Sequence, residues 1–381
     1  MTIVHICLTG VYTEGWTYQE NLLSKYHSKM GHDVVLIAST LTYDNSGRKC
    51  TTSKSAYKNQ DGVFVLRLKE KKDNPDRKFR RFPKLYDTLT NINPDILFVH
   101  SCQFLDVDAI IKYKRKCKYV KIYVDNHADF SNSANSFFSY HILHKIIWKN
   151  RAKRLEPYTE KFYGVMPARM EFLKKMYNLA DNKVELLVMG ADDEKVAAAL
   201  KPESRKRIRE IYGIDESDFL IVTGGKIDNA KRQTLQLMEA VNQFGKAKLL
   251  VFGSVADELK EDVNRLCSDS VQYIGWVDSS NTDQYFAAAD LVAFPGRHSV
   301  FWEQVAGLGI PMLVKDWPGT HHIDVGGNVK FLKEDSVSEI HNMLNNIIED
   351  KEIYKAMKKV AVEKGMAMFL YSKIAEHSIL G

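Results

Sequence analysis

The chain has 381 residues, of which 45% are hydrophobic and 27% are charged, and its formal net charge is +6. This length suits two domains, and the composition is that of a soluble globular protein rather than a disordered one. No apolar run approaches the roughly 18–20 residues that cross a bilayer, which argues against a transmembrane protein. Five scattered cysteines without a C-x-x-C pair argue against a zinc site and a disulfide framework, and favour a reducing cytosol.

Short apolar runs rich in β-branched residues alternate with amphipathic segments along the whole chain. In the first half these runs predict buried parallel strands at Ile3–Leu8, Val34–Ala38, Val63–Leu68, Ile96–Val99, Val120–Val124 and Val184–Met189. The N-terminus lacks the basic leader and cleavage site of a signal peptide, so we expect it to form the first strand. A helix that ends at Gly31 is predicted between the first two strands.

The second half repeats the scheme after a charged helix predicted at Glu203–Tyr212. Strands are predicted at Phe219–Thr223, Leu249–Phe252, Val271–Ile274, Leu291–Phe294 and Met312–Val314, and helices at Gln233–Phe244, Glu258–Cys267, Thr282–Ala288 and Phe301–Leu308. Two separate sets of strands and helices predict an α/β fold of two doubly wound, Rossmann-like domains, covering residues 1–195 and 196–365. Ligands of such sheets bind at the carboxyl ends of strands, so we expect the site in the cleft between the domains.

A loop with two glycines, Gly10 and Gly15, follows the first predicted strand. Glycine lets the backbone approach a ligand, and the N-terminus of the next helix can face an anion. The spacing is not G-x-G-x-x-G, so a dinucleotide site is unsupported and a plain strand–helix turn stays open. Polar and aromatic side chains in this loop favour contact with a sugar or an acceptor: Tyr12, Glu14, Trp16, Tyr18, Gln19 and Glu20.

The segments after the later strands of the first half carry other candidate groups. His127, near Asp129, follows the strand predicted at Val120–Val124 and can donate to a sugar hydroxyl or transfer a proton, although a histidine satisfied within its loop is an open alternative. Asp106 and Asp108 have the D-x-D spacing of aspartate pairs that bind a metal-bound diphosphate. Acidic residues also favour helix starts, so we expect no metal there.

Positive charge is concentrated in the first half of the chain. Between Arg67 and Lys121, fifteen Lys and Arg stand against seven Asp and Glu. A solvated basic face, an anionic membrane surface or a pyrophosphate-linked acceptor accounts for this bias, whereas no motif supports nucleic acid. Residues 136–154 mix apolar, aromatic and cationic side chains at near-helical spacing, which suits a membrane interface or, alternatively, a helix packed on the sheet.

Three cations, Lys226, Lys231 and Arg232, follow the glycine pair Gly224-Gly225 at the end of a predicted strand. Each alone suits a solvated side chain. Together they supply positive charge of the kind that a departing diphosphate needs. Their position beside two glycines therefore predicts a diphosphate site.

A second group of candidate residues surrounds the start of the helix predicted at Phe301–Leu308. Ser299 is a candidate N-cap, so the backbone N–H groups of His298, Ser299 and Val300 can point at a phosphate. Glu303 lies one turn into the helix among apolar neighbours, where a carboxylate needs a polar partner. Ribose hydroxyls would supply one.

These residues together resemble a retaining glycosyltransferase of family 4 with the GT-B fold, of the bacterial surface-polysaccharide type. The likeness extends over nearly the whole chain and includes Tyr18–Asn21, Gly31–His32, Tyr273–Val277 and Leu291–Pro311. It implies that Lys226 and Lys231 bind the diphosphate and that Glu303 binds the ribose. One position departs from the family pattern: the earlier glutamate, eight residues before Glu303, is Pro295 here, so the sugar contact is missing or falls to a group such as His298.

The resemblance also implies roles for the domains and for the candidate residues. Residues 1–195 would bind the acceptor, 196–365 the nucleotide sugar, and 366–381 would form a helix that returns to the N-terminal domain. The predicted catalytic residues are His127, Lys226, Lys231 and Glu303. The predicted donor-binding residues are Gly15, Gly225, Lys226, Lys231, Val277, His298, Ser299, Val300 and Glu303, and the predicted acceptor-binding residues are Tyr12, Trp16, Tyr18, Gln19 and Asp129.

The function implied is transfer of a hexosyl group from a nucleotide diphosphate sugar, expected to be a UDP-sugar, to a glycan or lipid-linked acceptor. No metal or other cofactor is expected. We expect a cytoplasmic protein, with peripheral contact to the inner face of an anionic membrane as a further hypothesis. A sugar-nucleotide epimerase or hydrolase on the same fold, and a non-catalytic binding subunit, remain the alternatives.

Overall fold

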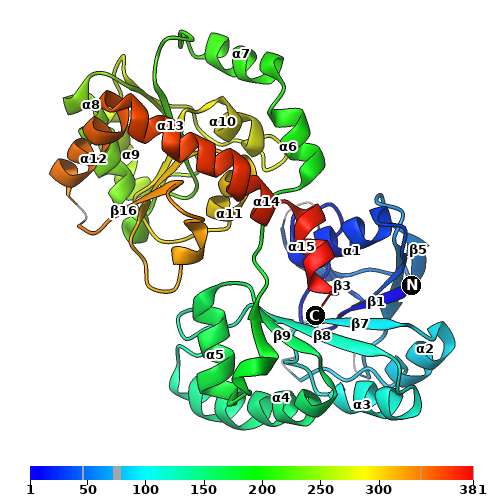
Figure 1. Ribbon diagram of the computed structural model, residues 1–381. Helices are drawn as coiled ribbons and strands as arrows, with labels where there is room; N and C mark the ends of the chain where they lie inside the picture. Colours follow the sequence, from blue (N-terminus) through cyan, green and yellow to red (C-terminus); the bar gives the residue numbers. More distant parts are fainter. Residues whose placement is uncertain (45–46, 72–78, 335, 381) are drawn as a thin grey trace. The chain divides into compact units, whose positions relative to one another are not determined.

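The computed structural model describes residues 1–44, 47–71, 79–334 and 336–380, which form two compact units (Figure 1). The N-terminal unit comprises Met1–Val188 with Ile374–Gly381, and the C-terminal unit comprises Met189–Lys373. The boundaries predicted from the sequence, 195/196 and 365/366, differ by a few residues because Ala191 pairs with the C-terminal segment. Its N–H donates to Phe369 O at 2.8 Å, and its carbonyl accepts from Tyr371 N at 3.0 Å.

Within the described residues, the N-terminal unit is built on an eight-stranded sheet with the order β10-β9-β8-β7-β1-β2-β6-β5. Its neighbouring strands are parallel except for β5 and β6, which pair antiparallel. The strands are β1 (Thr2–Cys7), β2 (Asp33–Ser39), β5 (Ala56–Lys58), β6 (Phe64–Leu68), β7 (Ile96–His100), β8 (Lys121–Asn126), β9 (Lys161–Gly164) and β10 (Val184–Leu186). A separate antiparallel ribbon joins β3 (Leu41–Tyr43) and β4 (Lys49–Thr51).

Helices cover both faces of this sheet (Figure 1). Its main helical segments are α1 (Gln19–Lys29), α2 (Leu85–Ile92), α3 (Val107–Lys116), the π-helical η1 (Ser139–Trp148), α4 (Lys149–Leu155), α5 (Pro167–Tyr177) and the C-terminal α15 (Tyr371–Ser378). Successive residues of a strand point to opposite faces. Val4 and Ile6 of β1 therefore join the large apolar cluster that includes residues of α2, α3 and α5, whereas His5 faces α1.

The C-terminal unit contains a six-stranded parallel sheet in its described residues, with the order β13-β12-β11-β14-β15-β16. The strands are β11 (Leu220–Gly224), β12 (Lys248–Phe252), β13 (Val271–Tyr273), β14 (Leu291–Phe294), β15 (Met312–Lys315) and β16 (Val329–Leu332). The α-helices are α6 (Asp193–Ala199), α7 (Pro202–Ile211), α8 (Gln233–Phe244), α9 (Lys260–Leu266), α10 (Thr282–Ala288), α11 (Phe301–Gly307), α12 (Val337–Glu349), α13 (Lys351–Val360) and α14 (Met366–Phe369).

The central strands of both sheets are almost entirely buried, as their uninterrupted apolar runs predict. This burial positions the polar residues that follow each strand at the carboxyl edge of its sheet. No helix in the described parts of the chain combines the length and the apolar character that crossing a bilayer requires.

Candidate functional site

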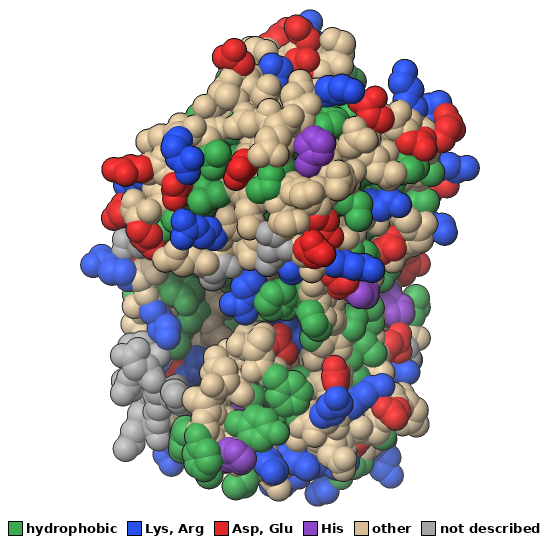
Figure 2. Space-filling view, turned by 90° about the vertical axis from the view of Figure 1, so that its left-hand side faces the viewer, with side chains coloured by type: hydrophobic (Ala, Val, Ile, Leu, Met, Phe, Trp, Pro, Cys, Tyr) green, Lys and Arg blue, Asp and Glu red, His purple; other side chains and the backbone are tan. Residues whose placement is uncertain are grey.

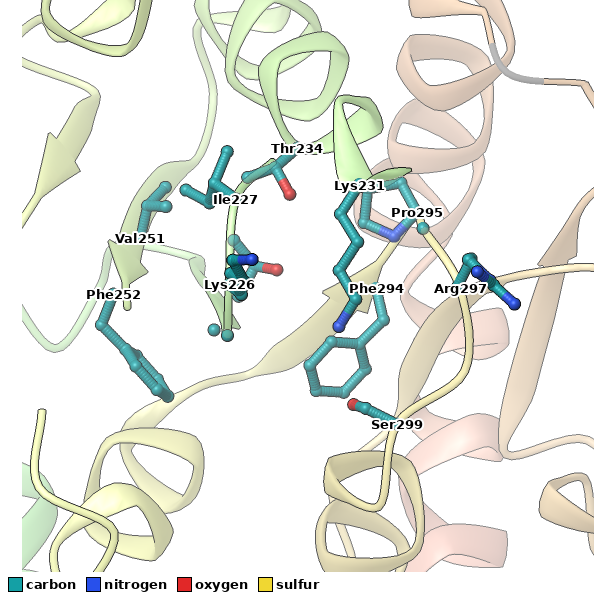
Figure 3. A pocket seen from close by; sticks show the side chains of 14 residues that line it. Lys226, Ile227, Lys231, Thr234, Val251, Phe252, Phe294, Pro295, Arg297 and Ser299 are labelled. Carbon is teal, nitrogen blue, oxygen red and sulfur yellow. The ribbon is translucent and has the colours of Figure 1, made fainter. Parts of the chain in front are cut away.

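A pocket in the C-terminal unit lies at the carboxyl ends of β11 and β14, where ligands of parallel sheets bind (Figure 3). Its lining residues come from the ends of β11, β12 and β14, from the turn before α8 and from the loop before α11. They are Thr223, Gly224, Gly225, Lys226, Ile227, Lys231, Thr234, Val251, Phe252, Phe294, Pro295, Gly296, Arg297 and Ser299. The structure thus brings together the predicted residues Gly225, Lys226, Lys231 and Ser299.

Glycines allow the ends of β11 and β12 to lie very close together at this pocket. A Cβ atom on Gly253 would lie 1.8 Å from the carbonyl oxygen of Gly225, and one on Gly224 would lie 2.2 Å from the ring of Phe252. Gly253 also has a φ of 129°, which side-chain-bearing residues rarely adopt. The N–H of Gly225 donates to Phe252 O at 3.0 Å, so this N–H already has a partner.

Cationic side chains converge on the pocket. Figure 3 shows the Lys231 side chain extending toward Phe294 and Ser299. Burial lowers the pKa of Lys231; Asp228 opposes this, and Arg297 and Lys226 lower it further. Because charges of one sign disfavour one another, such a cluster favours an anionic ligand.

The three cations differ in their surroundings. The Lys226 amine pairs with Asp228 at 3.1 Å, and its side chain is 65% exposed. The Arg297 guanidinium lies 5.4 Å from the centre of the Trp317 ring. Arg232, the third cation in the sequence-based prediction, pairs instead with Asp262 at 3.4 Å and is absent from the lining. Arg297, which the sequence-based prediction missed, also lines the pocket, and Figure 3 shows its side chain directed away from Lys231.

Glu303 of α11 is fully buried and is held by two histidines. Its Oε1 accepts from His298 Nε2 at 2.8 Å and from His322 Nε2 at 3.0 Å. Burial raises the pKa of Glu303, but the two histidines outweigh burial and lower the pKa to about 2. Among the described residues, Glu303 Oε2 and His322 Nδ1 are buried without a hydrogen-bond partner. The sequence-based prediction missed His322, since it follows Glu303 by nineteen residues in another segment.

The start of α11 differs from the expected one. Its N-cap is Val300 rather than Ser299, and no side chain caps it. The prediction that Ser299 caps α11 is therefore wrong. Ser299 instead lines the pocket, and its backbone carbonyl accepts a hydrogen bond from Trp302 N at 3.0 Å. Val300 is 37% exposed, whereas Val277, predicted near the nucleobase, is 9% exposed and absent from the pocket lining.

His127 follows β8 in the N-terminal unit, and its side chain is 39% exposed. Its Nε2 lies 3.6 Å from Oδ2 of the fully buried Asp125. Asp129, two residues on, is occupied locally: its Oδ1 accepts from Ser131 N at 2.7 Å and from Asn132 N at 2.9 Å. This turn leaves His127 as the more accessible of the two predicted residues.

The aromatic residues of the glycine-containing loop before α1 differ in how exposed they are. Gly15 has a φ of 77°, Tyr18 is 49% exposed, and Trp16 stacks on Tyr43 with the ring centres 5.1 Å apart. Tyr12 and Gln19, predicted to contact an acceptor, are 1% and 2% exposed and therefore offer almost no surface to a ligand.

The D-x-D carboxylates have arginine partners. Asp106 accepts from Arg81 at 3.0 Å, and Asp108 pairs with Arg151 at 3.0 Å and with Arg154 at 2.7 Å. In the residues that the structure describes, no group of three or more His, Cys, Asp and Glu side chains is arranged to hold a metal ion. The two carboxylates lie at the start of α3 and are thus neutralised by arginines from other segments.

Comparison with known proteins adds a family match and a fold match. Residues 204–364 match the family model described as Glycosyl transferases group 1. A search of curated proteins gave no match. Among the solved structures that match, the three described next are similar over nearly the whole length of both chains.

A glycosyltransferase from Rickettsia africae ESF-5 has a TM-score of 0.68 at 12% identity, covering 99% of this chain and 96% of that one. HepE from Anabaena, in complex with UDP and glucose, has a TM-score of 0.65 at 15% identity, covering 99% and 98%. UDP-GlcNAc 2-epimerase from Neisseria meningitidis, bound to UDP-GlcNAc, has a TM-score of 0.63 at 12% identity and covers 100% of both chains. These similarities confirm the predicted two-domain, Rossmann-like GT-B fold.

Proposed function

We propose that the protein transfers a hexosyl group from a UDP-sugar to a glycan or lipid-linked acceptor with retention of anomeric configuration, as a family 4 enzyme of surface-polysaccharide biosynthesis. The observation that carries this proposal is that three cationic residues, Lys226, Lys231 and Arg297, line one pocket at the carboxyl end of β11. The family match over residues 204–364, and the UDP and glucose bound by HepE, support a sugar nucleotide as the anionic ligand.

In the proposed reaction, the bond between the anomeric carbon and the diphosphate oxygen breaks, and the acceptor hydroxyl attacks from the face that the diphosphate leaves. The proton of that hydroxyl passes to the departing phosphate oxygen, so the products are a glycoside and UDP. Lys226 and Lys231 stabilise the negative charge that grows on the diphosphate. The family resemblance assigns the ribose to Glu303, the phosphate to the backbone at Gly15, and the donor or acceptor sugar to His127; Glu303 is fully buried and hydrogen-bonded to His298 and His322. No metal or cofactor takes part.

The nucleotide site is tested by thermal unfolding with UDP and with a panel of nucleotide sugars, because a bound ligand raises the apparent stability. We expect UDP to raise the midpoint temperature of unfolding of the wild type. Lys231→Ala should weaken UDP binding by about tenfold or more, since the substitution removes a charged contact to phosphate. Lys246→Ala is a matched control, because Lys246 is exposed and pairs with Glu349. A Lys231→Ala protein that binds UDP as tightly as the control would show that the diphosphate lies elsewhere.

An epimerase or hydrolase is the second candidate, and the similarity to UDP-GlcNAc 2-epimerase over the full length of both chains favours retaining it. Incubation with a UDP-sugar and no acceptor separates the two functions. A transferase turns over appreciably only when acceptor is added, whereas an epimerase or hydrolase forms product without it. Failure of every nucleotide sugar to bind would favour the non-catalytic subunit.

We also propose that the protein works in the cytoplasm, at the inner face of an anionic membrane. Phe137, Phe138, Ile142 and Ile146 are 80%, 52%, 37% and 58% exposed, although Leu143 and Trp148 of the same segment are buried. Figure 2 shows exposed hydrophobic side chains beside Lys and Arg side chains on one face of the molecule. Apolar side chains next to cations suit the boundary between lipid headgroups and acyl chains.

A further inference from the structure

Three histidines form a hydrogen-bonded line through the interior of the N-terminal unit, in a different unit from the cationic pocket. His5 lies on β1, His27 on α1 and His100 on β7. His5 Nε2 is 2.9 Å from His27 Nδ1, and His5 Nδ1 is 3.0 Å from His100 Nε2. Their exposed fractions are 0%, 0% and 6%, so water cannot replace these contacts.

The line ends on acceptors at both sides. His100 Nδ1 lies 2.7 Å from Oδ2 of Asp125, which is fully buried and directly opposite His100 in the register of β7 and β8. At the other end, His27 Nε2 lies 3.0 Å from the carbonyl oxygen of Ala375 and 3.0 Å from Ser378 Oγ, both on α15. Figure 1 shows α15 beside α1. The line therefore joins the C-terminal helix to the carboxylate next to His127.

Counting protons along this line gives its charge. Its four contacts, from Ala375 to His27, His5, His100 and Asp125, each need one N–H. A carbonyl oxygen and a carboxylate can only accept, and three neutral imidazoles supply three N–H groups. One additional proton is needed to fill all four contacts. The resulting imidazolium also offsets the buried charge of Asp125, which would be costly to leave without a partner.

We propose that the His27–His5–His100 line binds one proton in excess and switches between two hydrogen-bond directions when that proton is gained or lost. With the proton bound, His27 Nε2–H donates to α15, and the Ser378 hydroxyl donates to Ala375 O at 2.8 Å. Without it, the contact from His27 Nε2 to Ala375 O is lost. The other three contacts are kept when the protons of His5 and His27 both move to Nδ1, and the Ser378 hydroxyl turns from Ala375 O to donate to His27 Nε2. The proton thus couples attachment of the C-terminal helix to the charge beside His127. This inference does not depend on the proposed sugar transfer.

The surrounding groups favour His100 as the site of the proton. Burial lowers the pKa of His5 well below its usual range and that of His27 to about 4. Burial also lowers the pKa of His100, but the nearby Asp125 carboxylate outweighs burial, and the pKa of His100 is raised. Glu20 also raises the pKa of His100, and the ring centre of His32 lies 6.3 Å from that of His27. The other titratable groups near Asp125 are His127 and the buried thiols of Cys7 and Cys102, whose pKa values burial raises.

The proposal is tested by nitrogen NMR on full-length protein with ¹⁵N-labelled histidine, titrated through neutral and alkaline pH. At neutral pH we expect His100 protonated on both nitrogens, and His5 and His27 neutral with the proton on Nε2. When His100 loses its proton, His5 and His27 must both move their proton to Nδ1. A neutral His100 at neutral pH, or titration of His100 without the tautomer exchange, would overturn the proposal.

A variant of the terminal hydroxyl tests the switch itself. Ser378→Ala removes the hydroxyl that would donate to His27 Nε2 in the deprotonated line. The midpoint of the tautomer exchange should therefore rise by about one pH unit, the equivalent of one hydrogen bond. Ser378→Thr keeps the hydroxyl and should keep the midpoint. Ser372→Ala, on the same helix but outside the line, is the matched control. An unchanged or lowered midpoint in a folded Ser378→Ala protein contradicts the switch.

Discussion

Glu303 shows how a single buried carboxylate can depend on its neighbours. Glu303→Ala would leave the Nε2–H groups of His298 and His322 without their acceptor in a closed environment. Breaking a buried pair in this way typically costs about 3 kcal/mol or more of the free energy of unfolding. We therefore expect Glu303→Ala to unfold at a clearly lower urea concentration than the wild type, and Glu303→Gln, which keeps one oxygen, to fall in between.

The control for this prediction is Glu349→Ala. Glu349 pairs with Lys246 at 2.8 Å on the surface, where an ion pair contributes about 0–1 kcal/mol. Equal urea midpoints for Glu303→Ala and Glu349→Ala would mean that the two histidines do not depend on Glu303.

Sequence reasoning found the candidate residues whose signal is local. Lys226 and Lys231 follow a glycine pair within one short segment, and both line the pocket. Arg297 was missed although it directly precedes the predicted His298, because only the fold brings its segment to the same pocket as Lys226 and Lys231. His322 was missed because it reaches Glu303 from a separate segment. The same holds for the histidine line, since the sequence gives no sign that residues 5, 27 and 100 meet.

At the scale of elements, the parallel strands were predictable because burial on both faces leaves uninterrupted apolar runs. The predicted strands of the two sheets all occur, and α8 and α10 occur with the predicted bounds. β9 (Lys161–Gly164) and β16 (Val329–Leu332) were missed because they have only four residues each and carry lysines. The short strands β3, β4 and β5 were missed for a similar reason, since three residues carry too little pattern.

The segment from Phe137 through η1 and α4 gives a prediction at this scale. If its exposed apolar side chains enter a membrane, the double variant Phe137→Ser/Ile146→Ser should bind anionic vesicles at least about tenfold more weakly, because each buried apolar side chain contributes about 1.5–3 kcal/mol. Co-sedimentation with vesicles of phosphatidylglycerol and phosphatidylcholine measures this binding. Neutral vesicles of phosphatidylcholine alone should bind the wild type weakly, since the cations near the segment would have no anionic headgroups.

The matched control for this segment is Ile211→Ser. Ile211 is 61% exposed, similar to Ile146, but it lies on α7 of the C-terminal unit. Equal loss of vesicle binding in Ile211→Ser would show that general surface hydrophobicity, rather than the η1 segment, accounts for the binding.

At the scale of the whole molecule, each unit contains a buried ionisable group whose neighbours shift its pKa toward the charged form, upward for a histidine and downward for a glutamate. The N-terminal unit contains His100, whose pKa burial lowers but Asp125 raises above the usual 6.5. The C-terminal unit contains Glu303, whose pKa burial raises but two histidines lower from 4.5 to about 2. These shifts link the stability of each unit to a different range of pH.

The sign of each effect follows from which state binds more protons. Above pH 6.5 the folded N-terminal unit keeps a proton that the unfolded chain releases, so its stability should fall as the pH rises through the folded pKa of His100. Below pH 4.5 the unfolded chain protonates Glu303 while the folded C-terminal unit does not, so the stability of that unit should fall as the pH drops toward 2. His5 and His27, whose pKa values are lowered by burial, add a loss of stability in the N-terminal unit below pH 6.5.

Calorimetric unfolding between pH 2 and pH 10 should therefore show two transitions that respond differently to pH. Addition of UDP identifies the transition of the C-terminal unit, because a ligand raises the midpoint of the unit that binds it. We expect the loss of stability at alkaline pH in the transition of the N-terminal unit. Glu303→Gln should reduce the loss of stability at acid pH only in the UDP-sensitive transition of the C-terminal unit. An alkaline loss confined to the UDP-sensitive transition would contradict the assignment of the excess proton to the N-terminal unit, because the histidine line lies wholly within that unit.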